Sequence, residues 1–337
     1  MRVLITGCGG FLGREIASQL RVRGDDVVGL VRRPNAQLDA LGVRQLLGDI
    51  REPHVLNAGC IGVDAVIHTA ALAGVWGPWA TYFETNTLGT RNCLNACRET
   101  KVPIFVYCSS PSVTFDGKHQ SGIDERVPYP KRWLCHYPHT KAIAEQEVLA
   151  AHQPGQLHTI SLRPHLIWGA DDPHLIPRLV ARARSKRLAI VGDGRNRIDT
   201  VHVVNAALAH VLAVDRLSIG PDAGGRAYFI SQDEPVDCWE WIAELLNLAG
   251  IKRPSRQVSF RTAYAVGAMM ETLYRISSRR SEPPMTRFVA AQLALDHWFD
   301  LTAAKTQLGY QPLISSAMGL EQIRQRWHDA PPEWLKR

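Results

Sequence analysis

The chain has 337 residues, which suits either one two-part domain or two domains with an ample hydrophobic core. Hydrophobic residues make up 45% of it, and we find no bilayer-spanning apolar run, internal repeat, low-complexity tract or secretory signal. The formal net charge of +7 is compatible with phosphate-rich ligands, anionic acyl substrates or a membrane surface, but the basic residues are mostly spread out, which disfavours nucleic-acid binding.

The first feature along the chain is a glycine-rich turn between a predicted strand, Arg2–Ile5, and a predicted helix, Phe11–Arg23. Glycine permits backbone conformations closed to other residues and lets a phosphate reach bare N–H groups. The helix N-terminus adds partial positive charge where a pyrophosphate would sit. We therefore expect dinucleotide binding rather than an ordinary turn. The G-x-x-G-x-x-G motif comprises Gly7, Gly10, Phe11, Leu12 and Gly13.

The end of the second predicted strand, Val27–Val31, bears on the choice of cofactor. An enzyme that uses NAD usually carries Asp or Glu at this point to bind the ribose hydroxyls. This chain has Arg32 and Arg33 instead, and two guanidinium groups are well shaped to hold a 2′-phosphate. We therefore expect NADP, although the same two arginines would also suit a solvated surface.

Two further predicted strands also have polar residues at or near their ends. Leu46–Ile50 closes the third strand, and Asp49 there either accepts a hydrogen bond from the adenine amino group or caps a loop. Ala65–Ala71 is a continuous apolar strand, as a sheet covered on both faces requires. We expect His68 at its end to pack beside the cofactor rather than to act in catalysis.

The next segment, Gly74–Ala80, is rich in glycine and tryptophan and falls beyond the carboxyl end of a strand, where α/β proteins bind their ligands. Trp76 and Trp79 either wall a hydrophobic substrate site or belong to a surface flap. A helix is predicted over Thr81–Glu99, followed by a fifth strand over Pro103–Cys108 and then by a long polar loop over Asp116–Trp133.

Tyr137 and Lys141 are four residues apart in a predicted helix that ends near His152, so they share one face of it. An unperturbed tyrosine has a pKa of about 10, and a nearby ammonium group favours the phenolate. Ser110 follows the fifth strand, and its hydroxyl could hold the same substrate oxygen. Y-x-x-x-K alone is a weak motif, but it becomes specific after a glycine-rich turn and a strand-end serine.

Seven stretches together resemble the extended short-chain dehydrogenase/reductases, in their 3β-hydroxysteroid dehydrogenase-like branch. The resemblance implies that Ser110 and Tyr137 bind the reacting carbonyl oxygen, that Tyr137 donates the proton, and that Lys141 tunes Tyr137 and binds the nicotinamide ribose. It implies that Asn86 supports the active-site network, and it adds Ile50, Ala70, Ala71 and Pro164 to the cofactor site and His165 to the substrate site. The stretches are TGCGGFLG, VIHTAA, NTLGTRNCLNAC, YCSSPSV, YPHTK, SLRPHLIWG and LGYQP.

The second half is similar to reductases of long-chain 2-alkyl-3-oxo acids in bacterial olefin biosynthesis, on stretches such as LIWGADDPHLIPRLVARARSKRLAIVGDG and EPPMTRF. This similarity implies NADPH-dependent reduction of the 3-oxo group to a hydroxyl. A 3β-hydroxysteroid or sterol-carboxylate dehydrogenase using NAD shares every expected catalytic residue. A nucleotide-sugar epimerase or dehydratase is less favoured because Pro111 and Ser112 follow the serine, and a non-catalytic dinucleotide sensor would tend to lack Tyr137 or Lys141.

In the second half, a helix predicted over Asp172–Lys186 is basic on one side. One of its arginines, or Arg163, is a candidate partner for a substrate carboxylate, although a solvated face is the simpler explanation. The run Thr262–Ile276 is flanked by basic residues and suits a core or interface helix, an acyl-chain pocket or a membrane surface. Asp199 and His202 suit loop ties better than metal ligands, and we expect no metal site.

We therefore predict a doubly wound parallel sheet of the Rossmann type with a smaller C-terminal substrate domain. The division assigns residues 1–165 to NADP binding and 166–337 mainly to substrate binding, with the helix over 203–216 packing back on the first part. We expect a small acyl or sterol-like substrate, while a homodimer, an assembly with other biosynthetic enzymes and peripheral membrane contact stay open. The odd number of cysteines favours reduced thiols in a cytoplasmic protein.

Overall fold

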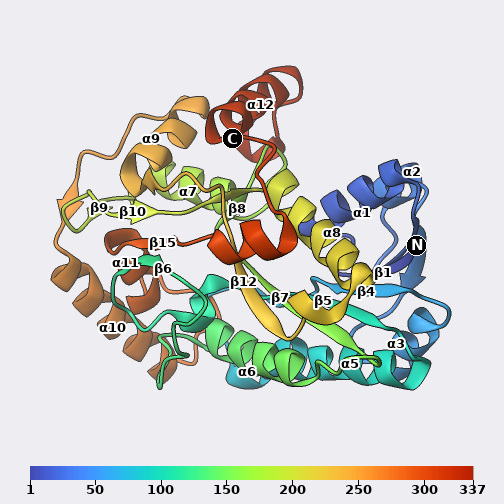
Figure 1. The fold of residues 1–337 in the computed structure, drawn as a ribbon. Coiled ribbons are helices and arrows are strands. Elements are labelled where there is room, and N and C mark those ends of the chain that lie inside the picture. The colour runs from blue at the N-terminus through green and yellow to red at the C-terminus, as the bar shows by residue number, and fades with distance from the viewer. Residues whose placement is uncertain (337) are drawn as a thin grey trace.

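The computed structural model describes residues 1–336, and one seven-stranded parallel sheet forms its centre (Figure 1). This arrangement confirms the predicted doubly wound sheet, with the strand order of dinucleotide-binding folds extended by a seventh strand. From one edge to the other the strands are β12 (Arg226–Ile230), β7 (His158–Pro164), β5 (Ile104–Cys108), β4 (Ala65–His68), β1 (Arg2–Thr6), β2 (Asp26–Val31) and β3 (Arg44–Leu47).

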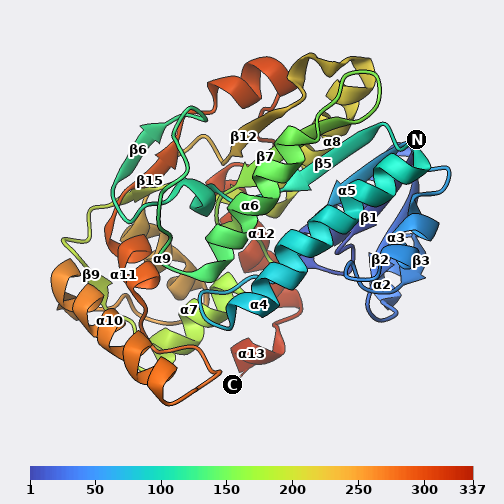
Figure 2. The same ribbon diagram turned by 90° about the horizontal axis from the view of Figure 1, so that it is seen from below.

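Both faces of the sheet are apolar, because the side chains of its strands alternate between two separate cores. Val3 and Ile5 point into the core that α1 (Phe11–Arg23) and α8 (Val203–Ile219) cover. Leu4 lies in the opposite core. The helices there are α3 (Pro53–Cys60), α5 (Gly89–Thr100) and α6 (His136–Ala150), and Figure 2 shows α5 and α6 running across this face.

A second lobe contains short strands and five longer helices around a third apolar core. Two of its sheets have two strands each: β8 (Ile167–Trp168) pairs with β11 (Val201–His202), and β9 (Ile190–Val191) pairs with β14 (Gln257–Val258). The third sheet has the strand order β13 (Val236–Asp237), β10 (Arg197–Ile198), β15 (His297–Phe299) and β6 (Gln120–Ile123). Its helices are α7 (Leu175–Arg184), α9 (Cys238–Leu248), α10 (Phe260–Ile276), α11 (Arg287–Ala294) and α12 (Ser316–Asp329).

The chain crosses between the two lobes in both directions. β12 lies after residue 165 but extends the central sheet beside β7. β6 lies before residue 165 but pairs with β15 in the second lobe. α8 packs against α1 on the central sheet (Figure 1). A boundary at residue 165 therefore does not separate the two lobes, because each sheet contains a strand from the other side of that boundary.

Two segments differ from the elements that the sequence pattern predicts. The loop expected between residues 116 and 133 contains β6, whose partner β15 lies far along the chain. The helix expected over Thr81–Glu99 is instead α4 (Trp79–Tyr82), a π-helix η1 (Phe83–Leu88) and then α5. The remaining short elements are α2 (Ala36–Ala40), η2 (Pro111–Thr114), η3 (Pro221–Ala223), η4 (Ala304–Leu308) and α13 (Glu333–Lys336). Among the helices within residues 1–336, none is long and apolar enough to cross a membrane.

Candidate active site

The glycine-rich turn joins β1 to α1, and its geometry depends on the absence of side chains. Gly7 has a φ of +70°, a conformation that favours glycine. A Cβ on Gly13 would lie 2.4 Å from the carbonyl oxygen of Gly7, so any side chain there would push the turn apart. Gly10 caps α1 without a side-chain hydrogen bond. The first N–H groups of α1 consequently face an open, weakly positive cradle that fits a pyrophosphate.

Arg32 and Arg33 are exposed directly after β2, at the edge where the glycine-rich turn lies. Asp49 follows β3 nearby, and its carboxylate accepts hydrogen bonds from the guanidinium and the backbone N–H of Arg51, each at 2.9 Å. The hydrogen bond from Arg51 lowers the pKa of Asp49, and Arg32 contributes to that lowering. The Asp49 carboxylate is therefore already paired with an arginine.

The other residues assigned to the cofactor follow the carboxyl ends of the central strands. Ala70 and Ala71 lie just after β4, and the backbone N–H of Ala70 donates to the Thr6 hydroxyl at 3.3 Å. Ile50 is buried behind the end of β3. Pro164 is the last residue of β7. These positions share one edge of the sheet with the glycine-rich turn, as parallel strand order requires.

Asn86 lies in the π-helix η1, where its side chain makes three hydrogen bonds. Its Oδ1 accepts from the backbone N–H of Leu72 at 2.7 Å, and its Nδ2 donates to the carbonyl of Leu72 at 3.1 Å. Nδ2 also contacts the Thr140 hydroxyl at 3.2 Å, one turn into the helix that begins at His136. Asn86 therefore ties the loop after β4 to the helix that carries Tyr137 and Lys141. Helical periodicity alone does not reveal the π-turn that aims this side chain.

Tyr137 lies in the first turn of α6 and is half-buried. Burial raises the pKa of Tyr137, the neighbouring Cys108 raises it further, and a hydrogen bond with Ser110 opposes the shift. The protein's own groups therefore keep Tyr137 in its phenol form at neutral pH. A phenol is the form that a proton donor requires.

Lys141 is buried one helical turn further along α6. Its Nζ donates to the carbonyl oxygen of Cys108 at 2.6 Å and lies 4.1 Å from the centre of the Tyr107 ring. Burial lowers the pKa of Lys141 to about 8, while Cys108 and Glu145 oppose this lowering. The ammonium group is thus fixed behind the site by β5, and Cys108 lies close to both Lys141 and Tyr137.

Ser110 has extended backbone at the start of η2, immediately after β5. Its hydroxyl lies 2.8 Å from the Ser112 hydroxyl and close enough to Tyr137 to lower the pKa of the phenol. Ser109 is buried instead, and its hydroxyl has no hydrogen-bond partner among the described residues, although it lies near Glu145. The structure therefore places Ser110, and not Ser109, with the Tyr137 hydroxyl.

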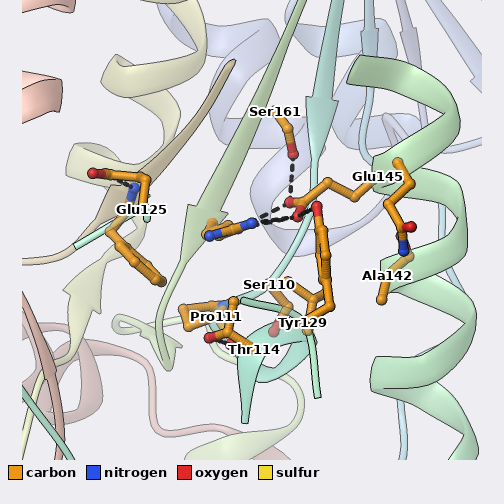
Figure 3. Close-up of polar contacts among 12 residues, drawn as sticks. Ser110, Pro111, Thr114, Glu125, Tyr129, Ala142, Glu145 and Ser161 are labelled. Atoms are coloured by element: carbon orange, nitrogen blue, oxygen red, sulfur yellow. Dashed lines mark hydrogen bonds and ion pairs between the residues drawn. The ribbon is translucent and has the colours of Figure 1, made fainter. Parts of the chain in front are cut away.

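Behind these residues lies a buried ion pair that the sequence pattern does not single out. Glu145 on α6 accepts from the Arg163 guanidinium at 2.6 Å, from the Tyr129 hydroxyl at 2.7 Å and from the Ser161 hydroxyl at 2.7 Å (Figure 3). Burial would raise the pKa of Glu145, but Arg163 overcomes this effect and lowers it. Arg163 therefore bonds to Glu145 through Nε and Nη2, while its Nη1 is buried without a hydrogen-bond partner within residues 1–336.

Besides Ser110, three further residues are assigned to the substrate, and they lie in different places. Trp76 lines a hollow of 470 Å³ beside α10, and its indole N–H donates to the carbonyl of Arg279 at 3.2 Å. Trp79 packs against His139, with ring centres 4.7 Å apart, on the outer side of α6. His165 is buried beside His297, with 2.7 Å between Nε2 and Nδ1. Trp76 alone faces a hollow, and Trp79 is a packing residue for the helix of Tyr137.

Together these groups can perform carbonyl–alcohol chemistry. A phenol and a hydroxyl converge on one point, a buried ammonium group stands behind them, and a phosphate-sized cradle lies along the same sheet edge. This combination can hold a dinucleotide, orient a carbonyl oxygen and deliver a proton to it.

Comparison with known proteins agrees with this geometry. Residues 4–261 match the model of the 3-beta hydroxysteroid dehydrogenase/isomerase family. The chain is 44% identical to a 2-alkyl-3-oxoalkanoate reductase of Shewanella oneidensis, over 95% of this chain and 84% of that protein. The reductase of the same name from Stenotrophomonas maltophilia is also 44% identical, over 96% of this chain and 98% of that protein.

More distant similarity extends to sterol enzymes and to solved structures. The decarboxylating sterol-4-alpha-carboxylate 3-dehydrogenase of Homo sapiens is 30% identical, over 96% of this chain and 87% of that protein. The crystal structure of gox2253 superposes with a TM-score of 0.79 at 27% identity, covering 98% of this chain and 99% of that one. MoeE5 in complex with UDP-glucose and NAD gives a TM-score of 0.74 at 25% identity, covering 98% and 100%.

Proposed function

Because the chain belongs to the 3-beta hydroxysteroid dehydrogenase/isomerase family, whose members are NAD(P)-dependent oxidoreductases, we propose that it reduces the 3-oxo group of a long-chain 2-alkyl-3-oxoalkanoic acid to a hydroxyl. The observation that carries this proposal is the 44% identity, over nearly the whole chain, to two reductases named for this substrate. The product would be a 2-alkyl-3-hydroxyalkanoic acid, an intermediate suited to olefin biosynthesis.

The residues of the chain have distinct roles in this reduction. A bound nicotinamide dinucleotide supplies the hydride. Tyr137 donates its phenolic proton to the carbonyl oxygen as negative charge develops there, which its raised pKa allows. Ser110 donates a hydrogen bond to the same oxygen. Lys141, anchored on Cys108, binds the ribose and lies behind the phenol, ready to stabilise the phenolate that proton donation leaves.

The cofactor part of the proposal is NADPH rather than NADH. Its support is the exposed pair Arg32 and Arg33 after β2, together with the pairing of Asp49 by Arg51. The glycine-rich turn from Gly7 to Gly13 holds the pyrophosphate in either case.

Turnover by the purified protein tests the proposal. NADPH should be oxidised in the presence of a long-chain 2-alkyl-3-oxo acid, and Tyr137→Phe should lower kcat by at least about 100-fold. Tyr264→Phe, which removes a hydroxyl beside Phe260 on α10, is the matched control and should retain turnover. Full activity in Tyr137→Phe would contradict the role given to this residue.

A sterol-carboxylate dehydrogenase is the second candidate, supported by the 30% identity to the human sterol enzyme. The same assay separates the two candidates when a sterol 4-carboxylate and NAD are supplied in parallel. Oxidation of the sterol without reduction of the acyl acid would replace the first proposal with the second.

A further inference from the structure

An apolar cavity lies within the second lobe, enclosed mainly by α7, α9 and α11. Its volume is 160 Å³, close to that of an engineered apolar cavity that accommodates benzene. A short stretch of alkyl chain fits this volume, whereas a four-ring sterol nucleus does not. The apolar wall includes Leu175, Leu179, Leu188, Ile198, Trp241 and Ile242.

One end of the cavity reaches the residues that follow the central sheet. Leu166 and His297 both line it. Leu166 comes two residues after Pro164, the last residue of β7, and His297 contacts His165 through the 2.7 Å ring nitrogen contact. One end of the cavity therefore lies beside the residues that follow β7 at the carboxyl edge of the central sheet.

Arg178 and Arg182, one turn apart on α7, also line the cavity. Both contact the carboxylate of Glu282, which lies 3.4 Å from Arg182 and is bonded more closely to Arg178. Two guanidinium groups and one carboxylate leave a surplus of one positive charge. Burial and the neighbouring Arg178 lower the pKa of Arg182, and Glu282 only partly opposes this effect. A second anion would relieve that repulsion.

This charged cluster also lies near the candidate reaction centre. Both Glu282 and Arg178 influence the pKa of Tyr82 on α4. α4 packs against α6, the helix that carries Tyr137. In a 2-alkyl-3-oxo acid the carboxylate is separated from the reacting carbon by a single carbon, so a carboxylate subsite has to lie close to Tyr137.

From these contacts we propose that Arg182, with Arg178 beside it, binds the carboxylate of an acyl substrate, while the cavity behind α7 holds one of its alkyl chains. The inference rests on the proposed function and names the part of the site that would recognise its substrate. The hollow beside Trp76 fits this role less well. Arg275, Arg279, Arg280 and Arg287 also give it a positive surplus around Glu271, but its wall is more polar than that of the cavity behind α7, so it suits an alkyl chain less well.

Binding of decanoate and of its uncharged analogue decanamide tests the inference without requiring turnover. Isothermal titration should show that Arg182→Gln weakens decanoate binding by about 10- to 100-fold, the range expected for a lost charge-assisted hydrogen bond. Decanamide binding should change less than about twofold. Arg187→Gln, an exposed arginine near the end of the same helix, is the matched control and should bind both ligands as the wild type does. An unchanged decanoate affinity in Arg182→Gln would overturn the proposal, as would an equal loss for both ligands.

A cavity-filling variant tests the alkyl part separately. Leu179→Trp should weaken the binding of both decanoate and decanamide by at least about 10-fold, because an indole would occupy the space of the alkyl chain. A thermal melt checks that this variant folds. Wild-type affinity for both ligands in a folded Leu179→Trp protein would show that the chain lies elsewhere.

Turnover then separates the inference from the proposed function. In steady state, Arg182→Gln should raise KM for a 2-alkyl-3-oxo acid about 10- to 100-fold and leave KM for its methyl ester unchanged. Equal effects on acid and ester would contradict the carboxylate subsite. If the wild type reduces neither compound but binds decanoate in an Arg182-dependent way, the proposed reaction fails while the anion and chain subsites stand.

Discussion

The guanidinium of Arg163 lies 2.6 Å from the carboxylate of Glu145, and both side chains are almost completely buried. This pair joins β7 to α6, the helix that carries Tyr137 and Lys141. Figure 3 shows Tyr129 and Ser161 completing the hydrogen bonds of the carboxylate. The rear of the candidate site is thus an ionic anchor and not an apolar contact.

Removing one member of this pair should destabilise the protein strongly. Arg163→Met should lower the free energy of unfolding by about 3–5 kcal/mol, because the Glu145 carboxylate would remain buried without its partner. Combining it with Glu145→Met should restore part of that loss, since no uncompensated charge would remain. Urea unfolding of the two single variants and the double variant measures the coupling. Additive losses in the double variant would show that the pair does not act as a unit.

The same pair predicts a specific acid sensitivity. The folded pKa of Glu145 is lower than its ordinary value of 4.5, so its stabilising contribution is complete above that value. The contribution is lost as pH falls through the lower folded pKa, where the folded carboxylate also takes up a proton. Glu145→Gln should therefore lack this part of the decline in stability below pH 4.5. Parallel acid unfolding curves for the variant and the wild type would argue against the lowered pKa.

Much of this site follows from local sequence signals. The residues of the glycine-rich turn are contiguous, and Tyr137 and Lys141 are related by helical spacing. The continuous apolar strands predict a sheet that is covered on both faces. The geometry brings Ser110 to Tyr137 as expected, while the chemical roles of these residues stay predictions. Signals of this kind lie within a few residues of each other, so no knowledge of the tertiary structure is needed.

Features that depend on distant partners were not predictable in this way. The sequence pattern predicts a loop where β6 lies, because four residues such as Gln120–Ile123 form a strand only when β15, far along the chain, pairs with them. The π-turn around Asn86 has no distinctive composition, so the pattern predicted one continuous helix. Arg163 was a candidate for substrate binding until the fold placed the Glu145 carboxylate against it.

Lys141 should make stability rise with pH over a defined interval. Its pKa is lowered from 10.5 to about 8, chiefly by burial, so the folded protein loses this proton at a lower pH than the unfolded chain. Between about pH 8 and 10.5 the unfolded state binds more protons, and stability increases with pH. The shift corresponds to about 3 kcal/mol. Lys141→Met should lack this increase, so the difference in unfolding free energy between wild type and variant should grow across the interval. A constant difference would show that the buried ammonium group titrates normally.

Arg32 and Arg33 should set the preference for NADPH over NADH. Replacing both with alanine should raise the Kd for NADPH about 10- to 100-fold, because charge-assisted hydrogen bonds to the 2′-phosphate would be lost. The Kd for NADH should change less than about threefold. Fluorescence titration with each cofactor measures both values, and Arg44→Ala on β3, an exposed arginine, is the matched control. If the Kd values for NADPH and NADH rise by the same factor, the two arginines contribute overall positive charge and do not recognise the 2′-phosphate.

Asn86 should act as a positioning residue whose effect appears mainly in kcat. Its side chain holds the loop at Leu72 and, through the Thr140 hydroxyl, the first turn of α6. Asn86→Ala should lower stability by about 1–3 kcal/mol and kcat by about 10-fold or more, with little change in KM, because both attachments are lost while the substrate pocket stays intact. Thr140→Val is the informative comparison, since it removes only the link to α6. A fall in kcat in both variants would place the effect at Tyr137, whereas a fall confined to Asn86→Ala would place it in the loop after β4. Steady-state kinetics together with urea unfolding distinguish these outcomes, and an Asn86→Ala protein with wild-type kcat would show that the network has no catalytic consequence.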